Sequence, residues 1–166
     1  HSDLRRQRQM CIRDRDMPEL PEVETTVRAI SKFQNKILKE IIVHNADLRW
    51  KVDKNISQLS KNKLIKEISR RAKYILIHFN DSSLMIHLGM SGKLRIQNIG
   101  NNFFKKHDHI ELIFDKEKIV FNDTRRFGSI HFTKSFKNHR LIENLGVEPL
   151  SSCLLYTSPS PRDRSL

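Results

Sequence analysis

Hydrophobic positions change their spacing along the chain, and this change separates a helical start from a strand-rich remainder. Val23, Val27 and Ile30 recur every three to four residues, which predicts a helix over Pro21–Gln34 with one buried apolar stripe. Pro21 in the first turn suits a helix start, and Glu22 suits the positive end of the helix dipole. The chain is therefore expected to begin its folded part with an amphipathic helix.

After this helix the apolar period becomes two, in short segments rich in Ile and Phe. Eight segments are predicted to be strands: Leu38–Asn45, Leu64–Ser69, Tyr74–Phe79, Leu84–Leu88, Lys93–Gln97, His109–Phe114, Lys118–Phe121 and Ser129–Thr133. Helices are expected at Val52–Lys61 and at Ser135–Leu145, the second ending at Gly146 as its C-cap. The order predicts an α+β fold, a β-sandwich of about eight short strands with flanking helices.

Both ends of the chain differ in composition from the middle. Residues 1–16 and 152–166 together hold seven Arg and no Lys or Asn, whereas residues 17–151 hold eight Arg, sixteen Lys and eleven Asn. Two interpretations stand. The ends are disordered basic arms of a nucleic-acid binder, or they are foreign segments from cloning or translated adapter sequence, which we favour. We therefore predict one domain over 17–151 between two tails.

Charge narrows the class of partner. The chain carries 31 Lys and Arg against 19 Asp and Glu, a formal net charge of +12, and 17–151 alone retain +9 from 24 basic and 15 acidic residues. This balance favours a polyanionic partner, nucleic acid above all. No apolar run is long enough to cross a bilayer, and the first sixteen residues do not resemble a signal peptide. Two distant cysteines exclude a disulfide framework and a four-thiolate zinc site, so a soluble protein of a reducing compartment is expected.

The segment Met17–Glu24, MPELPEVE, has the most chemical content. If translation starts at Met17 and the Met is removed, Pro18 becomes a secondary amine that is partly neutral near pH 7, because an α-amino pKa is about 8. Such an amine can attack an electrophilic carbon and form an iminium, with Glu19 and Glu22 transferring protons. Inside the chain as written its nitrogen is an amide, which cannot form a Schiff base. From the residues alone, a Pro and three Glu that merely start a helix are the favoured interpretation.

Six segments in order resemble the N-terminal domain of bacterial formamidopyrimidine-DNA glycosylase. They are MPELPEVE at 17–24, RRAKY at 70–74, HLGMSG at 87–92, KHDH at 106–109, DTRRFG at 123–128 and LGVEPL at 145–150. The resemblance covers Met17 to about Ser151. Leu20 favours the oxidised-purine branch over the endonuclease VIII group, which usually has Gly there. Thr124 departs from the pattern, because the family commonly has proline at this position.

The resemblance implies an enzyme of base-excision DNA repair. It would be a bifunctional DNA glycosylase and AP lyase that removes 8-oxoguanine and formamidopyrimidines from double-stranded DNA and cleaves the strand by β,δ-elimination. Pro18 would be the nucleophile at C1′ and form the Schiff base, with Glu19 as general acid and base. Glu22 would help to hold the site and its water. Lys73 and His87 would contact phosphates around the lesion.

Met90, Arg125 and Phe127 resemble the family's void-filling group. An enzyme that extrudes a stacked base leaves a hole, which apolar wedges can fill while an arginine bonds the orphaned base opposite. Arg126 and His107 are expected among the DNA-binding residues. From the residues alone, Met90 and Phe127 could also be core residues and the two arginines a solvated turn.

His107-Asp108-His109 has the residue types of a metal site. Alternation places the two histidines on one face and Asp108 on the other, with no fourth ligand, so no metal and no other cofactor is expected in this chain. The family's zinc would belong to a four-cysteine finger that, with a helical domain, follows the resembling part in full-length members. The chain is expected to be the N-terminal catalytic domain alone, with DNA binding weakened by the missing phosphate contacts.

The sequence thus leaves three hypotheses about function. The first is the glycosylase and lyase, expected as a monomer in the bacterial cytoplasm, associated with the nucleoid and without a membrane partner. The second is a non-catalytic module that binds damaged DNA. The third is a basic RNA-associated β-domain, which none of the motifs in the sequence indicates.

Overall fold

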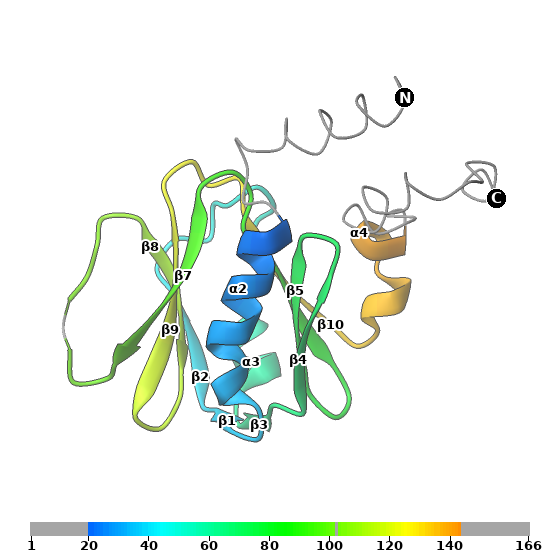
Figure 1. The fold of residues 1–166 in the computed structure, drawn as a ribbon, viewed down its shortest axis with the longest axis horizontal. Helices are drawn as coiled ribbons and strands as arrows, with labels where there is room; N and C mark the ends of the chain where they lie inside the picture. The colour runs from blue at the N-terminus through cyan, green and yellow to red at the C-terminus, as the bar shows by residue number, and fades with distance from the viewer. Residues whose placement is uncertain (1–19, 102, 144–166) are drawn as a thin grey trace.

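The structure is a computed structural model that describes residues 20–101 and 103–143 (Figure 1). Its strands are β1 (Ile37–Leu38), β2 (Glu40–Val43), β3 (Lys63–Leu64), β4 (Glu67–Arg71), β5 (Tyr74–His78), β6 (Ser83–His87), β7 (Gly92–Asn98), β8 (Asp108–Ile113), β9 (Glu117–Asp123) and β10 (Ser129–Thr133). Its helices are α2 (Leu20–Ile30), η2 (Ser31–Phe33), α3 (Ile56–Ser60), η3 (Phe136–Asn138) and α4 (Arg140–Glu143).

Two antiparallel sheets of four strands form a sandwich. One has the order β10-β6-β5-β4 and the other β2-β8-β9-β7, while β1 and β3 pair in a small sheet of their own. Figure 1 shows one sheet on each side of α2. The predicted α+β sandwich with flanking helices is confirmed.

The main core lies between the sheets and under α2. Val23, Val27 and Ile30 are buried, as the helical spacing predicts, and the chain then tightens into η2, where the Phe33 ring lies 4.2 Å from that of Phe114. The sheets contribute apolar side chains from their facing sides, among them Ile41, Ile75, Ile77, Leu84, Ile86, Leu112, Ile119 and Phe121. Each fully buried side chain of this kind contributes about 1.5–3 kcal/mol of transfer free energy, so this layer stabilises both sheets together.

A second, smaller core lies on the outer face of the sheet that contains β5 and β6. Tyr74, Leu76 and Met85 face outward there and are covered by Ile142 of α4, with Phe136 and Leu141 packed beside them. This cover explains why β5 and β6 are buried on both faces and read as continuous apolar runs rather than as an alternating pattern.

Most predicted elements shift by a residue or two at an end, and several are divided or shortened in the structure. The strand predicted at Leu38–Asn45 divides, because β1 pairs with β3 while β2 pairs with β8; the segment Leu64–Ser69 divides between β3 and β4 for the same reason. The helix predicted at Val52–Lys61 starts only at Ile56, since Asp53 accepts bonds from the backbone of Asn55 and Ile56 and forms a turn. The helix predicted at Ser135–Leu145 is interrupted, because His139 has an extended backbone that separates η3 from α4. Its predicted C-cap, Gly146, lies outside the described residues.

Several loops meet at one end of the sandwich, called here the upper end as it appears in Figure 1. It comprises residues 44–51 after β2, the β4–β5 turn, the β6–β7 loop, the β9–β10 loop and the first turn of α2. Within 20–101 and 103–143, no helix has the length and apolar character needed to span a bilayer. The two predicted tails lie outside these ranges.

Candidate functional site

Two loops of the upper end pack against each other through their backbones. Gly89 has a φ of +63°, and a Cβ at that position would lie 2.5 Å from the backbone nitrogen of Gly128. In the same β6–β7 loop, a Cβ on Gly92 would lie 2.2 Å from the carbonyl oxygen of Leu88, to which the Gly92 N–H donates a bond of 2.7 Å. Only glycine allows both approaches: Gly89 lets the two loops pack against each other, and Gly92 lets the β6–β7 loop close tightly on itself.

A buried carboxylate fastens the same two loops. Asp123, at the end of β9, is 0% exposed and accepts bonds from the hydroxyl of Ser91 and from the N–H of Gly128, each 2.7 Å long. The Ser91 hydroxyl in turn accepts the N–H of Arg125 at 3.0 Å, and His109 donates from Nε2 to the carbonyl oxygen of Asp123 at 2.7 Å. Hydrogen bonds to an ionised acceptor are stronger than neutral ones, so this carboxylate is the anchor of the site.

Met90, Arg125 and Phe127, called here the projecting group, extend from this anchored base. Arg125 Nη1 lies 3.7 Å from the sulfur of Met90, and Phe127 is 45% exposed. Neither Met90 nor Phe127 is therefore a core residue, and the core interpretation is wrong. The structure brings Met90 and Arg125 into contact from facing turns, and the backbone of Phe127 lies against Gly89 beside them, an arrangement that the void-filling interpretation requires.

Arg126 stands in the left-handed region, with a φ of +59°. For a residue with a Cβ this conformation costs about 1–2 kcal/mol, so it persists because the neighbouring backbone is held on both sides. Among the described residues, neither Arg125 nor Arg126 forms an ion pair. Both guanidinium groups therefore remain available for an anionic partner.

His87 ends β6 beside these loops, opposite Tyr74 of β5 and Ser129 of β10. Its Nδ1 accepts the N–H of Gly89 at 2.9 Å, which leaves the proton of the neutral ring on Nε2. Burial, and then the positive charges of Lys73 and Arg49, lower the pKa of His87 to about 4. At neutral pH His87 is thus an uncharged N–H donor.

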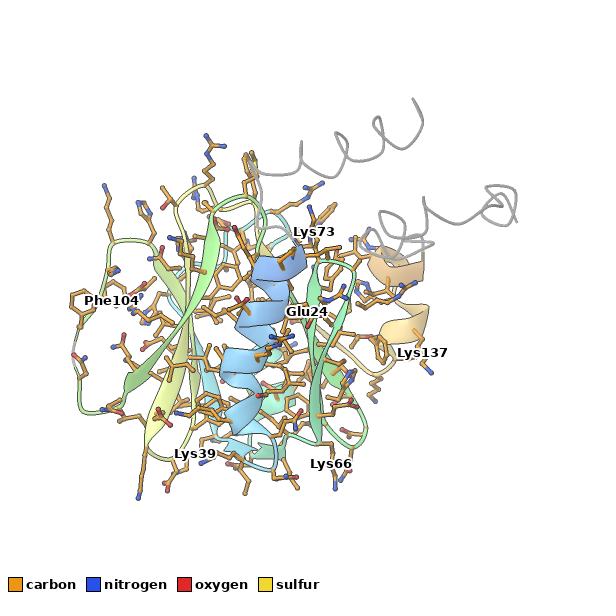
Figure 2. The ribbon with its side chains drawn as sticks, in the orientation of Figure 1. Glu24, Lys39, Lys66, Lys73, Phe104 and Lys137 are labelled. Carbon is orange, nitrogen blue, oxygen red and sulfur yellow. The ribbon has the colours of Figure 1, made fainter. Side chains whose placement is uncertain are left out.

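Lys73 lies in the β4–β5 turn, next to the residue that pairs with His87. Figure 2 shows Lys73 at the same end of the molecule as the first turn of α2, and α2 packs on β4 and β5. The link between helix and sheet includes an ion pair of 2.5 Å between Arg70 Nε and Glu24 Oε1. Predicted site residue Glu22 is exposed in the first turn of α2, whereas Pro18 and Glu19 lie outside the described residues.

His107 and Arg126 share a hollow of about 430 Å³ on the side of the upper end. Its lining comprises His44, Asn45, Phe104, Lys106, His107, Asp108, His109, Thr124 and Arg126. The rings of His107 and His109 lie 6.2 Å apart, so the prediction that they share a face is confirmed. The part of the chain that the structure describes holds no group of three His, Cys, Asp or Glu placed to bind a metal ion.

Asp108 belongs to the same lining and is buried. Arg95 donates two bonds to its carboxylate, of 2.6 and 3.0 Å, and the backbone of Lys105 and the amide of Asn122 donate one each. Burial by itself would raise the pKa of Asp108, but these donors outweigh it and hold the pKa at about 2. Asp108 is therefore a structural anion rather than a ligand.

Sequence reasoning missed the residues that hold the site together. The sequence puts Asp123 and Ser91 in turns and gives neither a role of its own, and Arg49 belongs to no motif. The N–H of Arg49 donates to Gly128 at 3.2 Å, and its guanidinium lies 5.7 Å from the ring of Trp50, which Arg140 approaches to 5.1 Å from α4. Both arginines stand beside the site at positions for which the sequence carried no motif.

The fold and the site together define a two-sheet α+β domain whose loops present cations and apolar side chains at one end. Residues 17–130 match the formamidopyrimidine-DNA glycosylase N-terminal domain. The formamidopyrimidine-DNA glycosylase of Alcanivorax borkumensis is 47% identical over 137 residues, which cover 81% of this chain and 50% of that protein. That of Ruthia magnifica is 44% identical over 138 residues, 82% of this chain and 51% of that protein.

Solved structures agree with these relatives. A crystal structure of Lactococcus lactis Fpg (MutM) in complex with FAPY-dG-containing DNA has a TM-score of 0.66 and 29% identity, covering 72% of this chain and 45% of that one. The same enzyme bound non-covalently to DNA with an AP site has a TM-score of 0.65 and 28% identity, covering 72% and 46%. This chain belongs to the formamidopyrimidine-DNA glycosylase family, and it spans about half the length of the curated relatives it matches.

Proposed function

We propose that this chain is the catalytic N-terminal domain, residues 17–151, of a bifunctional DNA glycosylase and AP lyase that removes 8-oxoguanine and formamidopyrimidines from double-stranded DNA. The observation that carries the proposal is the projecting group, held on two anchored loops beside His87 and Lys73 in a chain of this family. As a monomeric enzyme of base-excision repair it would act on the nucleoid in the bacterial cytoplasm.

The proposed chemistry begins at Pro18. Its free amine attacks C1′ of the damaged nucleotide, the bond from C1′ to the base breaks, and the base leaves with a proton. Glu19 acts as general acid and base in opening the sugar and in the eliminations that follow, and Glu22 helps to hold the site and its water. The iminium at C1′ draws electrons from the sugar, so that the 3′ and then the 5′ phosphate leave. A Pro18 bound in an amide is inert, and the chain must be liberated at this residue.

The projecting group would hold the DNA open. Extruding a stacked base costs a few kcal/mol, which Met90 and Phe127 offset by filling the vacated space while Arg125 bonds the orphaned base. Lys73 and the uncharged N–H of His87 would bind phosphates next to the lesion, and Arg126 with His107 would bind a phosphate at the hollow they share. A neutral donor at His87 adds hydrogen bonding to a phosphate without adding a positive charge to the site.

The test is borohydride trapping on a duplex that contains one 8-oxoguanine, with protein that starts at Met17 and is confirmed by mass to have lost this Met. We expect a covalent adduct that peptide mapping places at Pro18. The 166-residue chain is the matched control, because its Pro18 nitrogen is an amide, and it should give no adduct. Absence of an adduct with a confirmed free Pro18, or an adduct elsewhere, would refute the proposed chemistry.

A second candidate is a module that binds damaged DNA without catalysis. The exposed projecting group favours it, since Phe127 and Arg125 can probe a duplex without Pro18. Lesion binding that survives Pro18→Gly and is lost in Phe127→Ala, in a protein without lyase activity, would support this candidate. RNA that competes as well as lesion DNA would instead indicate an RNA-associated domain.

A further inference from the structure

Two adjacent aromatic side chains are exposed on the loop between β7 and β8. Phe103 is 54% and Phe104 56% exposed, and Ile99 of the same loop is also exposed. Figure 2 shows Phe104 at the outer flank of the sheet that contains β7 and β8, away from the first turn of α2. Single exposed apolar residues are common on protein surfaces, whereas a cluster of exposed aromatic rings usually marks a surface that binds a partner.

Buried side chains hold the backbone of this loop on both sides of the rings. The amide of buried Gln97 donates to the carbonyl oxygen of Phe103 at 2.9 Å, and the Phe103 N–H donates to the side chain of Asn101 at 2.9 Å. On the other side, the carboxylate of buried Asp108 accepts the N–H of Lys105 at 2.7 Å. The rings are therefore presented by a built loop, since a frayed one would leave such buried groups without these bonds.

Positive charge surrounds the two rings. The guanidinium of Arg95 and the ammonium of Lys105 lie 5.5 and 5.6 Å from the centre of the Phe103 ring. Phe104 meets the ring of His44 edge-on at 5.2 Å, and it lines the 430 Å³ hollow together with Lys106 and Arg126. The one carboxylate in that lining, Asp108, is occupied by Arg95.

The hollow is lined by Lys106 and Arg126, and Lys105 lies beside the Phe103 ring. Lys105, Lys106 and Arg126 form no ion pair within the described ranges. The surface therefore combines cations that can neutralise phosphates with rings that can stack on flat groups. An acidic peptide would use the cations but would leave the two rings unexplained.

We infer that Phe103, Phe104, Lys106, His107 and Arg126, the aromatic-basic surface, bind an unpaired stretch of DNA strand. Bases offer their flat faces to a protein ring only when they are unpaired, and stacking on aromatic side chains beside a basic groove is how single strands are held. This inference rests on the proposed function, which places the DNA at the projecting group. Arg126 of the aromatic-basic surface is next in sequence to Arg125 of that group. A strand end or gap near the lesion would continue onto this surface.

The test measures binding of the full chain to two fluorescent probes by anisotropy: an oligothymidine of about ten nucleotides and a blunt duplex with one 8-oxoguanine. The variant Phe103→Ala/Phe104→Ala should bind the oligothymidine about tenfold more weakly and the blunt duplex unchanged. Phe104→Leu, which keeps an apolar side chain but removes the ring, should weaken oligothymidine binding in the same direction. Ile37→Ala, an exposed apolar position at the opposite end, is the matched control and should change neither.

Thermal unfolding of each variant establishes that it folds. Unchanged oligothymidine binding in the folded double variant would overturn the inference, as would an equal loss of binding to both probes. If the wild type binds oligothymidine through these rings but does not bind the lesion duplex, the inferred single-strand binding is supported while the proposed function is refuted. If it binds the duplex but does not bind oligothymidine, only the inference about the aromatic-basic surface is refuted.

Discussion

The two ends of the sandwich are stabilised in different ways. At the upper end, the buried Asp123 and the close approach of Gly89 to Gly128 hold two loops from within. The lower end, around the β8–β9 turn and a hollow of about 640 Å³, carries ion pairs on its surface, such as Lys39 with Asp115 at 2.9 Å. Lys63 with Asp81 at 3.0 Å is another, between β3 and the β5–β6 turn.

This contrast bears on how a strongly basic domain can bind a polyanion. Lys39 and Lys63 of the lower end pair with neighbouring carboxylates, whereas Arg125 and Arg126 of the upper end meet no carboxylate within the described part of the chain. The upper loops obtain their rigidity from a buried anion and from backbone contacts. Their surface cations are therefore free for a partner, and four changes test whether the two ends differ in this way.

Removing the buried carboxylate has the largest expected effect. Asp123→Ala leaves the Ser91 hydroxyl and the Gly128 N–H without their acceptor, and should lower the free energy of unfolding by about 3–4 kcal/mol. Denaturant unfolding measures this loss. The matched change at the lower end, Asp115→Ala, removes only an exposed ion pair and should leave the unfolding midpoint unchanged. Equal losses in the two variants would erase the distinction between the ends.

Acidification should weaken the upper end through His87. Because its pKa is about 4 in the folded protein and about 6.5 when unfolded, the unfolded chain takes up the proton first as pH falls. Stability that is fully present above pH 6.5 is then lost down to about pH 4, by about 2–3 kcal/mol for this group. Partly buried His131, with a pKa also lowered to about 4 mainly by burial, adds a loss of the same sign.

Unfolding curves at intervals between pH 7 and 4 measure this dependence. His87→Gln should flatten it and leave the contribution of His131. A profile that is identical in wild type and His87→Gln would show that His87 is not held neutral by the fold.

Gly89→Ala should have a smaller effect, of about 1–2 kcal/mol, because alanine is strained at a φ of +63° and the loops must separate to admit its Cβ. Gly100→Ala is the control, since nothing lies within 4 Å of a Cβ there and no positive φ is required. Thermal melts of the two variants should differ by several degrees. Similar melts would mean that the β6–β7 and β9–β10 loops are not tightly fitted.

The smallest expected effect is on the salt dependence of DNA binding. In a plot of log affinity against log salt concentration, Arg126→Ala should make the slope shallower by about the amount that one phosphate contact contributes. The free energy of unfolding should change little. Lys39→Ala, whose ammonium already pairs with Asp115, should leave the slope unchanged. A slope that responds equally to both changes would place the DNA on both ends of the molecule.

Most of the fold could be predicted from hydrophobic periodicity. β10 has the predicted bounds and β5 differs by one residue, because each is a regular segment between clear turns. The division of Leu38–Asn45 could not be predicted, since a period of two records which side chains are buried but not which strand lies alongside. At Lys39 the chain changes partner from β3 to β8 without any change in the pattern.

The site divides in a similar way. His87, Met90, Arg125 and Phe127 were identified through the family resemblance, and the structure brings them together at one end. The role of Asp123 could not be read from the sequence, because a lone aspartate before a turn is typical of a solvated loop. Its burial depends on Ser91, more than thirty residues away, and on a glycine close enough to donate its N–H.

The strand pairings also set an order of events during synthesis. Glu40 of β2 lies opposite Ile113 of β8, and Ile130 of β10 lies opposite Ile86 of β6. A nascent chain can form the neighbouring strands β4, β5 and β6 early, yet neither four-stranded sheet is complete until its late strands have left the ribosome. Contacts so distant in sequence close slowly, and the apolar stripe of α2 stays accessible to chaperones in the meantime. The domain is therefore expected to fold late and all at once.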